Sequence, residues 1–354
     1  MRRDDLEAAA AEGLITRDQA RRLIEFVAET KRATPSVYLA DDESVHFVRG
    51  FHDVFLSIGL ILLLIGAGYG GLIVAGASGI LLTALVAWGL AEVVARKYRL
   101  VLPSIVLAIA FTLTAGIGAG PVLWSTPLAT PQSLMNGVFP LSLGSVGLIA
   151  SILFYIRFRL PFALGLAAGS TILLMLAGRH VIIGPGYAPD ATTIVLMCGV
   201  ATFVAAMAYD LSDPGRRTLR SDNAFWLHLL SAPLIVHSVF SIMLPEGRTA
   251  MTAGDATVVI ATVAALGLVA IIIDRRALFV AGLGYLGFAV STLIGEHEAG
   301  SGAVFAGTLL LLGSVIVALG FGWTNVRRLL LKPLQHTGVA RRLPPVAWPA
   351  GRNR

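Results

Sequence analysis

The chain has 354 residues, of which 56% are hydrophobic and only 14% are charged, and its formal net charge is +6. A water-soluble globule needs more charged residues than this to cover its surface. The composition therefore excludes an ordinary soluble domain and predicts a membrane protein with several spans. The single cysteine, Cys198, excludes a disulfide framework and a zinc motif of the CxxC kind. Arginine far outnumbers lysine among abundant Ala, Gly and Leu, which is typical of a GC-rich bacterial genome.

Residues 1–32 predict a short helical hairpin at the amino terminus. Gly13 ends a first helix, and Thr16 with Gln19 forms the capping-box pattern that starts a second helix. A hairpin of this size is too small to be stable alone, so we expect it to dock on the membrane domain, on a second copy of the chain or on a protein partner. Residues 33–53 then form a linker and an interfacial segment.

Ten long apolar runs follow in residues 54–323. A bilayer core about 30 Å thick requires roughly 20 mostly apolar residues in each spanning helix. The runs therefore predict an all-α polytopic membrane helix bundle. They cover residues 54–76, 80–95, 101–119, 139–156, 160–176, 193–209, 224–244, 256–273, 277–294 and 302–323. Residues 324–354 predict a basic tail that is largely disordered.

The basic residues follow the predicted spans in an alternating pattern. Of the 27 Lys and Arg residues, all except Arg179 and Arg248 lie in the two terminal segments or in every second connection. The positive-inside rule then predicts that both termini lie in the cytoplasm of a bacterial inner membrane, which agrees with an even number of spans. Topology accounts for the net charge, so we expect the lipid bilayer as a partner and no nucleic acid. The ten spans could also form two halves of five helices each. Because five is odd, the second half would then enter the membrane in the opposite direction, so an inverted repeat remains an open alternative.

The order of parts at the amino terminus resembles a known family. The segment GLITRDQA, at residues 13–20, is followed by a linker and by spans that begin FHDVFLSIGLILLLIGAGY. This layout resembles the bacterial predicted membrane protein family called domain of unknown function 2157 over most of the chain. That family has no established activity, so the resemblance implies a multi-span membrane protein and no site residues.

Two glycine motifs match a dinucleotide-binding pattern by spelling. They are GAGYGG, which begins at Gly66, and GLGYLG, which begins at Gly282. The pattern requires a strand before it and a helix amino terminus after it, but both motifs lie inside apolar spans. We expect these small residues to let membrane helices approach closely, as Gly66 and Gly70 would do at a spacing of four.

The seventh predicted span carries the candidate site. Ionisable groups inside a membrane are costly, and this span holds His228 and His237 with Pro233 midway between them. On a straight helix the two histidines point to opposite faces and lie roughly 13 Å apart along the axis, so they could share a metal ion only if Pro233 broke the helix. We take these three residues as a candidate ligand or proton site, with Asp222 and Asn223 at its cytoplasmic edge. The alternative is that each imidazole only bonds a neighbouring helix.

The connection before this span contains Arg216, Arg217 and Arg220. Arginine pairs well with phosphate groups, so these residues are candidate contacts for an anion or an acidic lipid, although the positive-inside rule also explains them. Elsewhere, the i,i+4 spacing of Glu92 and Arg96 predicts an ion pair at the membrane interface.

Three classes of function remain. The sequence shows no arrangement of nucleophile and base and no metal-ligand motif, so we expect no enzymatic activity, no bound metal and no cofactor. A non-catalytic membrane component, a sensor or scaffold, fits the amino-terminal hairpin. The alternative is a small-solute permease with its site around a proline-broken seventh helix and a ligand that stays unknown. A membrane enzyme or haem protein is a more remote alternative.

Overall fold

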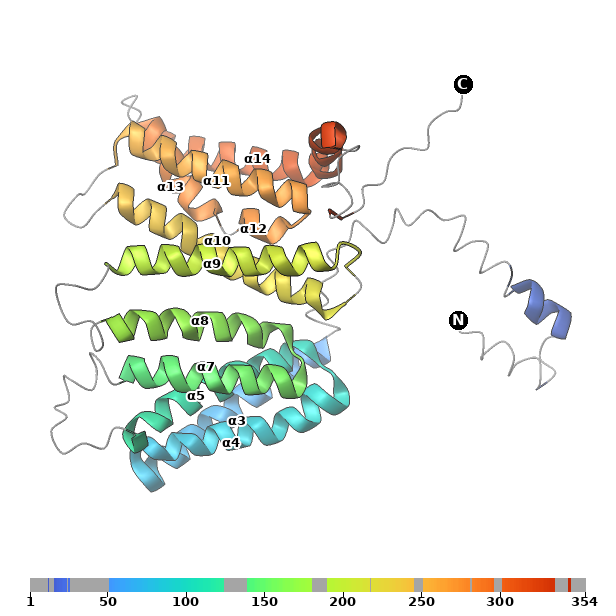
Figure 1. The fold of residues 1–354 in the computed structure, drawn as a ribbon, viewed down its shortest axis with the longest axis vertical. Coiled ribbons are helices and arrows are strands. Elements are labelled where there is room, and N and C mark those ends of the chain that lie inside the picture. The colour runs from blue at the N-terminus through green and yellow to red at the C-terminus, as the bar shows by residue number, and fades with distance from the viewer. Residues whose placement is uncertain are drawn as a thin grey trace. The chain divides into compact units, whose positions relative to one another are not determined.

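The computed structural model describes residues 12, 16–23, 25, 51–123, 139–179, 190–216, 218–244, 251–280, 282–295, 301–334 and 343–344. All regular elements in these ranges are helices, which confirms the all-α membrane bundle (Figure 1). Within the same ranges, 8 helical segments are long and apolar enough to cross a membrane. Residues 1–44 with 345–354 form one compact unit, and residues 45–344 form another.

In the first unit, the structure confirms the predicted capping box. The backbone N–H of Thr16 donates to Oε1 of Gln19 at 2.8 Å, and the N–H of Gln19 donates to Oγ1 of Thr16 at 3.2 Å. Helical residues 17–23 follow directly. The first helix of the expected hairpin and most of the linker lie outside the described residues.

The second unit contains the membrane helices. In chain order these are α3 (Phe51–Ala75), α4 (Leu81–Ala91), α5 (Val101–Leu123), α7 (Phe139–Phe158), α8 (Pro161–Gly178), α9 (Ala191–Ser212), α10 (Leu219–Met243), α11 (Ala253–Ile273), α12 (Arg276–Val280), α13 (Leu283–Gly295) and α14 (Ser301–Leu331). Short segments of other helix types are η2 (Gly76–Ile80), η3 (Glu92–Tyr98) and η6 (Lys332–Leu334).

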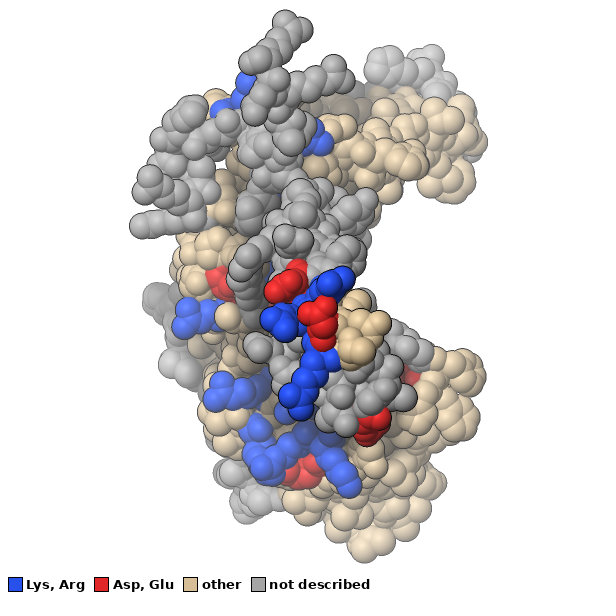
Figure 2. Space-filling model, turned by 90° about the vertical axis from the view of Figure 1, so that its right-hand side faces the viewer, with Lys and Arg blue, Asp and Glu red and all other residues tan. Residues whose placement is uncertain are grey.

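The turns that follow η3, α7, α9 and α11 lie at one end of the bundle, because successive long helices run in opposite directions (Figure 1). Lys and Arg side chains gather on this face (Figure 2). We call it the basic end. Among the described residues of the second unit, Arg179 after α8 is the one Lys or Arg that belongs to the other end. The alternation predicted from the sequence is therefore present in the helix order.

Helices α3 and α4 form a hairpin, although both belong to one helical run of 48 residues. Gly76 has a φ of 61°, which glycine adopts without strain, and the chain reverses there. A Cβ on Gly71 would lie 2.1 Å from the carbonyl oxygen of Gly79, so at this point the two arms touch backbone to backbone. The expected close approach at Gly66 and Gly70 is wrong, because nothing lies within 4 Å of a Cβ at either position.

Helix α10 differs from the prediction at its proline. It runs from Leu219 to Met243 without interruption, so Pro233 does not break it. Helix α9 packs closely on the next turn, where a Cβ on Gly199 would lie 3.0 Å from Cβ of Leu234. Packing of neighbouring helices compensates for the single backbone hydrogen bond that a proline removes.

The break occurs instead in the ninth predicted span. Helix α12 ends at Val280 and α13 begins at Leu283, and between them the N–H of Gly282 donates to the carbonyl of Phe279 at 3.1 Å. A Cβ on Gly282 would lie 3.1 Å from Cγ1 of Val263, so this turn lies against α11. Helix α13 has 13 residues and is too short to cross a core of about 30 Å by itself.

Helix α14 continues past Trp323 to Leu331, beyond the predicted end of the last span. Arg327 lies within this extension, where it is buried and its Nη2 donates to the carbonyl of Pro344 at 2.7 Å. Part of the predicted tail is therefore helical. Residues 335–342 and 345–354 lie outside the described residues.

Helices α5 and α10 are the central helices of the bundle. Helix α5 contacts α3, α4, α7 and α8, whereas α10 contacts α8, α9, α11, α12 and α13. An aromatic cluster lies beside α5, with the Trp88 and Phe111 ring centroids 5.0 Å apart and those of Phe154 and Phe158 4.5 Å apart. The α3 helix presents many exposed apolar side chains, as a lipid-facing helix does.

Candidate functional site

Three buried polar side chains meet at the basic end, between α9, α10 and the turn after α11. Nε2 of His228 lies 2.8 Å from Oδ2 of Asp210, and Nη2 of Arg275 donates to Oδ1 of the same carboxylate. The His228, Asp210 and Arg275 side chains are only 0%, 8% and 4% exposed. Arg275 also donates to the carbonyl and hydroxyl oxygens of Ser221, each at 2.9 Å. The carboxylate thus has two partners, as a buried charge requires.

A second carboxylate extends this network to α14. Asp274 ends α11 with a φ of 60°, and Nε1 of Trp323 donates to its Oδ1 at 2.7 Å. Its Oδ2 lies 3.7 Å from Nη1 of Arg216 and 3.6 Å from Nη1 of Arg327. Arg216 also donates to the carbonyl of Ile273 at 2.8 Å, so it caps the carboxyl end of α11. We call the whole set the ionic cluster: Asp210, His228, Arg275, Asp274, Arg216 and Arg327.

His228 retains one ring nitrogen without a protein partner. Its side chain is fully buried, and among the described residues nothing bonds its Nδ1. The ring of Phe203 packs edge-on against it, with centroids 5.4 Å apart.

The acid–arginine pair occurs twice at the basic end with one spacing. Glu92, the first residue of η3, accepts hydrogen bonds at 2.8 Å from both Nε and Nη2 of Arg157, which is 65 residues away. Asp210 and Arg275 are also 65 residues apart. The two pairs are therefore related by one constant offset in residue number. The predicted pair of Glu92 with Arg96 is present as well, at 3.4 Å.

This offset relates α4, α5, α7 and α8 to α9, α10, α11 and the α12–α13 pair. Because each helix corresponds to the fourth one after it, the two sets run in the same direction, and the arrangement supports a tandem repeat over an inverted one. In the first set the side chains of Glu92 and Arg157 are 31% and 38% exposed. The second set buries its pair and adds His228, where the offset places Ala110 in the first set. We call these two sets of helices the first repeat and the second repeat. The histidine is present in the second repeat and has no counterpart at the corresponding position of the first.

The other predicted site residues are not assembled with His228. Asp222 is exposed in the first turn of α10, whereas Asn223 is buried and its Nδ2 donates to the hydroxyl of Tyr155 at 2.6 Å. His237 is exposed, and its Nδ1 lies 3.0 Å from the hydroxyl of Tyr285 on α13. The two histidines therefore have separate partners. In the described ranges no group of three His, Cys, Asp or Glu residues could hold a metal ion.

The three predicted anion contacts also separate. Arg216 is engaged inside the ionic cluster, Arg220 is exposed, and Arg217 lies outside the described residues. The residues that sequence reasoning missed are Asp210 and Arg275. Each lies at the boundary of a predicted span, where a single charge is common. The signal that could have found them is the spacing of 65 residues that they share with Glu92 and Arg157.

The apolar helices make the chain an integral membrane protein. No family model, no curated protein and no solved structure matches it.

Proposed function

We propose that the chain is a non-catalytic component of a bacterial inner membrane, a sensor or scaffold whose basic end faces the cytoplasm. The observation that carries this proposal is the closure of the ionic cluster. Asp210 contacts Arg275 and His228, and Asp274 contacts two arginines and an indole N–H. Neither carboxylate is left to bind a transported ion. The positive-inside rule supports a cytoplasmic basic end. The resemblance of residues 13–20 to domain of unknown function 2157 supports a multi-span membrane protein without an assigned activity.

The ionic cluster joins five elements at one level of the bundle. They are α9, the connection before α10, α10 itself, the turn after α11, and α14. Removing either carboxylate would take a counter-charge from buried arginines, so the ionic cluster favours fixed positions of these elements relative to one another. A sensor or scaffold can use helices that are held together in this way, and it needs no water-filled path through the membrane.

A small-solute permease is the second candidate, and the break between α12 and α13 favours it. Discontinuous helices free backbone groups near the membrane midplane for a substrate. Tyr285 follows the break by two residues and lies 3.0 Å from Nδ1 of His237 on α10. Under this alternative, water would reach the buried polar face of α10.

Thiol labelling distinguishes the two candidates. Ser231 and Ser238 on α10 are 0% exposed, and Ser→Cys changes the side chain little. Each cysteine is placed alone in a Cys198→Ala background and is treated with a membrane-impermeant methanethiosulfonate in right-side-out and in inverted vesicles. Ser151 on α7, also 0% exposed, is the matched control in the first repeat.

The proposed function predicts no labelling at all three serine positions. Labelling at Ser231 or Ser238, with none at Ser151, would refute the closed bundle and support a permease. A cysteine at the exposed Ser212, at the basic end of α9, tests the orientation in the same vesicles. We expect this cysteine to react in inverted vesicles alone, and reaction in right-side-out vesicles would contradict a cytoplasmic basic end.

A further inference from the structure

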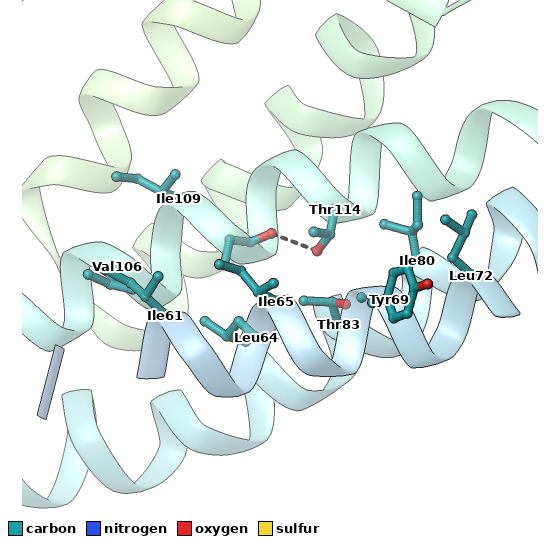
Figure 3. Close-up of a pocket in the computed structure, with 12 residues that line it drawn as sticks. Ile61, Leu64, Ile65, Tyr69, Leu72, Ile80, Thr83, Val106, Ile109 and Thr114 are labelled. Carbon is teal, nitrogen blue, oxygen red and sulfur yellow. Dashed lines mark hydrogen bonds between the residues drawn. The ribbon is translucent and has the colours of Figure 1, made fainter. Parts of the chain in front are cut away.

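A cavity of about 600 Å³ lies between α3, α4 and α5 (Figure 3). Its volume falls within the range of about 300–1,000 Å³ that is usual for small-molecule sites. Most of its wall is aliphatic, with Ile61, Leu64, Ile65, Leu72, Val106 and Ile109 among the lining residues. It shares no residue with the ionic cluster. An apolar ligand from the membrane is therefore its natural occupant.

One buried polar group lines this apolar cavity. Thr83 is 2% exposed, and its hydroxyl bonds nothing among the described residues. Gly68 of α3 lies directly beside that hydroxyl, since a Cβ there would be only 3.1 Å from it, so any larger side chain at this position would displace what lies next to Thr83. By contrast, the hydroxyl of Thr114 donates to the carbonyl of Ala110 at 2.6 Å (Figure 3). A buried hydroxyl without a partner is costly, so the geometry calls for a ligand with a hydrogen-bond acceptor.

The position of the cavity along α3 indicates the leaflet that it faces. It extends from Ile61 to Leu72, which is about 16 Å at 1.5 Å per residue and roughly half of a hydrocarbon core of about 30 Å. Its polar end, with Thr83 and Ile80, adjoins the α3–α4 turn, which is opposite the basic end. Tyr69 is 67% exposed and lines the cavity, as interfacial aromatic residues do near lipid head groups.

We propose that this cavity binds one acyl chain of a glycerophospholipid from the leaflet opposite the basic end. In this arrangement, Thr83 donates a hydrogen bond to an ester carbonyl, and the chain extends toward the membrane midplane along Ile61 and Val106. The lipid satisfies the buried hydroxyl and fills the space between α3 and α5. It therefore acts as a structural part of the bundle, and the proposal does not depend on whether the chain is a scaffold or a permease.

The test is native mass spectrometry of the full chain, purified from its own membrane in a mild detergent. We expect one phospholipid retained per chain, identified as such by chloroform extraction and lipid analysis. Gly68→Leu fills the cavity and should abolish retention. Gly66→Leu adds the same side chain to open space on α3 and should leave retention unchanged. Thr83→Val keeps the shape but loses the donor, which should weaken retention by up to about tenfold.

Equal retention in the Gly68→Leu and Gly66→Leu variants, both shown to be folded by circular dichroism and gel filtration, would overturn the proposal. An extract that contains a quinone or detergent alone, without phospholipid, would overturn it as well. If Gly68→Leu does not fold, Ala110→Leu fills the same cavity from the α5 side and carries the same expected loss.

Discussion

Replacing Asp210 by Asn tests the energetic role of the ionic cluster. The substitution conserves size but removes the charge that Arg275 and His228 both contact. The Asp210 and Arg275 side chains are 8% and 4% exposed, so the variant would take away the carboxylate charge that the buried arginine contacts directly. Breaking a buried pair in this way costs about 3–5 kcal/mol. We expect the free energy of unfolding of the Asp210→Asn variant to fall by about that amount.

The first repeat supplies the matched control. Glu92→Gln removes the corresponding acid, but the Glu92 and Arg157 side chains are 31% and 38% exposed, so water screens the charge that remains. We therefore expect a loss below about 1 kcal/mol. The double variant Asp210→Asn with Arg275→Gln should lose less than the sum of its single variants, since the two residues interact directly.

The measurement is reversible unfolding by sodium dodecyl sulfate in mixed micelles, followed by circular dichroism. If Glu92→Gln destabilises the protein as much as Asp210→Asn does, burial is not what makes the second pair important. If Asp210→Asn is nearly neutral, the ionic cluster does not hold the second repeat together. Either result would refute the reasoning from the structure.

Three further predictions use the same assay. Gly79→Ala places a Cβ 1.9 Å from a carbonyl oxygen of α3 and should destabilise the hairpin by at least about 1–3 kcal/mol, whereas Gly66→Ala should not. Tyr285→Phe removes an exposed hydrogen bond and should cost no more than about 1.5 kcal/mol; a larger loss would mean that this bond does more than join two helices. A hydrogen bond from the Thr193 hydroxyl lowers the pKa of Asp190 below its usual 3.8. The stability from this helix cap should therefore be complete at neutral pH and fall as the pH drops below 3.8, and Asp190→Asn should abolish that dependence.

Local patterns in the sequence predicted most of the helices. The capping box at Thr16 and Gln19 depends on residues three positions apart, so it could be recognised without any tertiary information. The break at Gly282 could not, since the apolar run continues through it and the turn depends on packing against Val263 of α11. Pro233 suggested a break that is absent, because α10 continues through it and neighbouring helices pack against this part of α10.

The candidate site divides in the same way. The sequence indicated His228 as a candidate because it is an ionisable residue inside a span. The free-energy cost of placing such a group in hydrocarbon depends on the residue type and its depth, which the sequence gives. It could not name the partner, since Asp210 and Arg275 are brought to His228 by three different elements.

By itself, the sequence determined that this protein lies in a membrane. It also determined the apolar runs and the gathering of arginines in every second connection between them. These properties follow from transfer free energies and helix length, which each segment carries independently. The tertiary structure alone decided which charges are buried together, where a helix breaks and where a cavity opens between α3 and α5. Those features depend on contacts between residues far apart in the chain, and no local pattern specifies them.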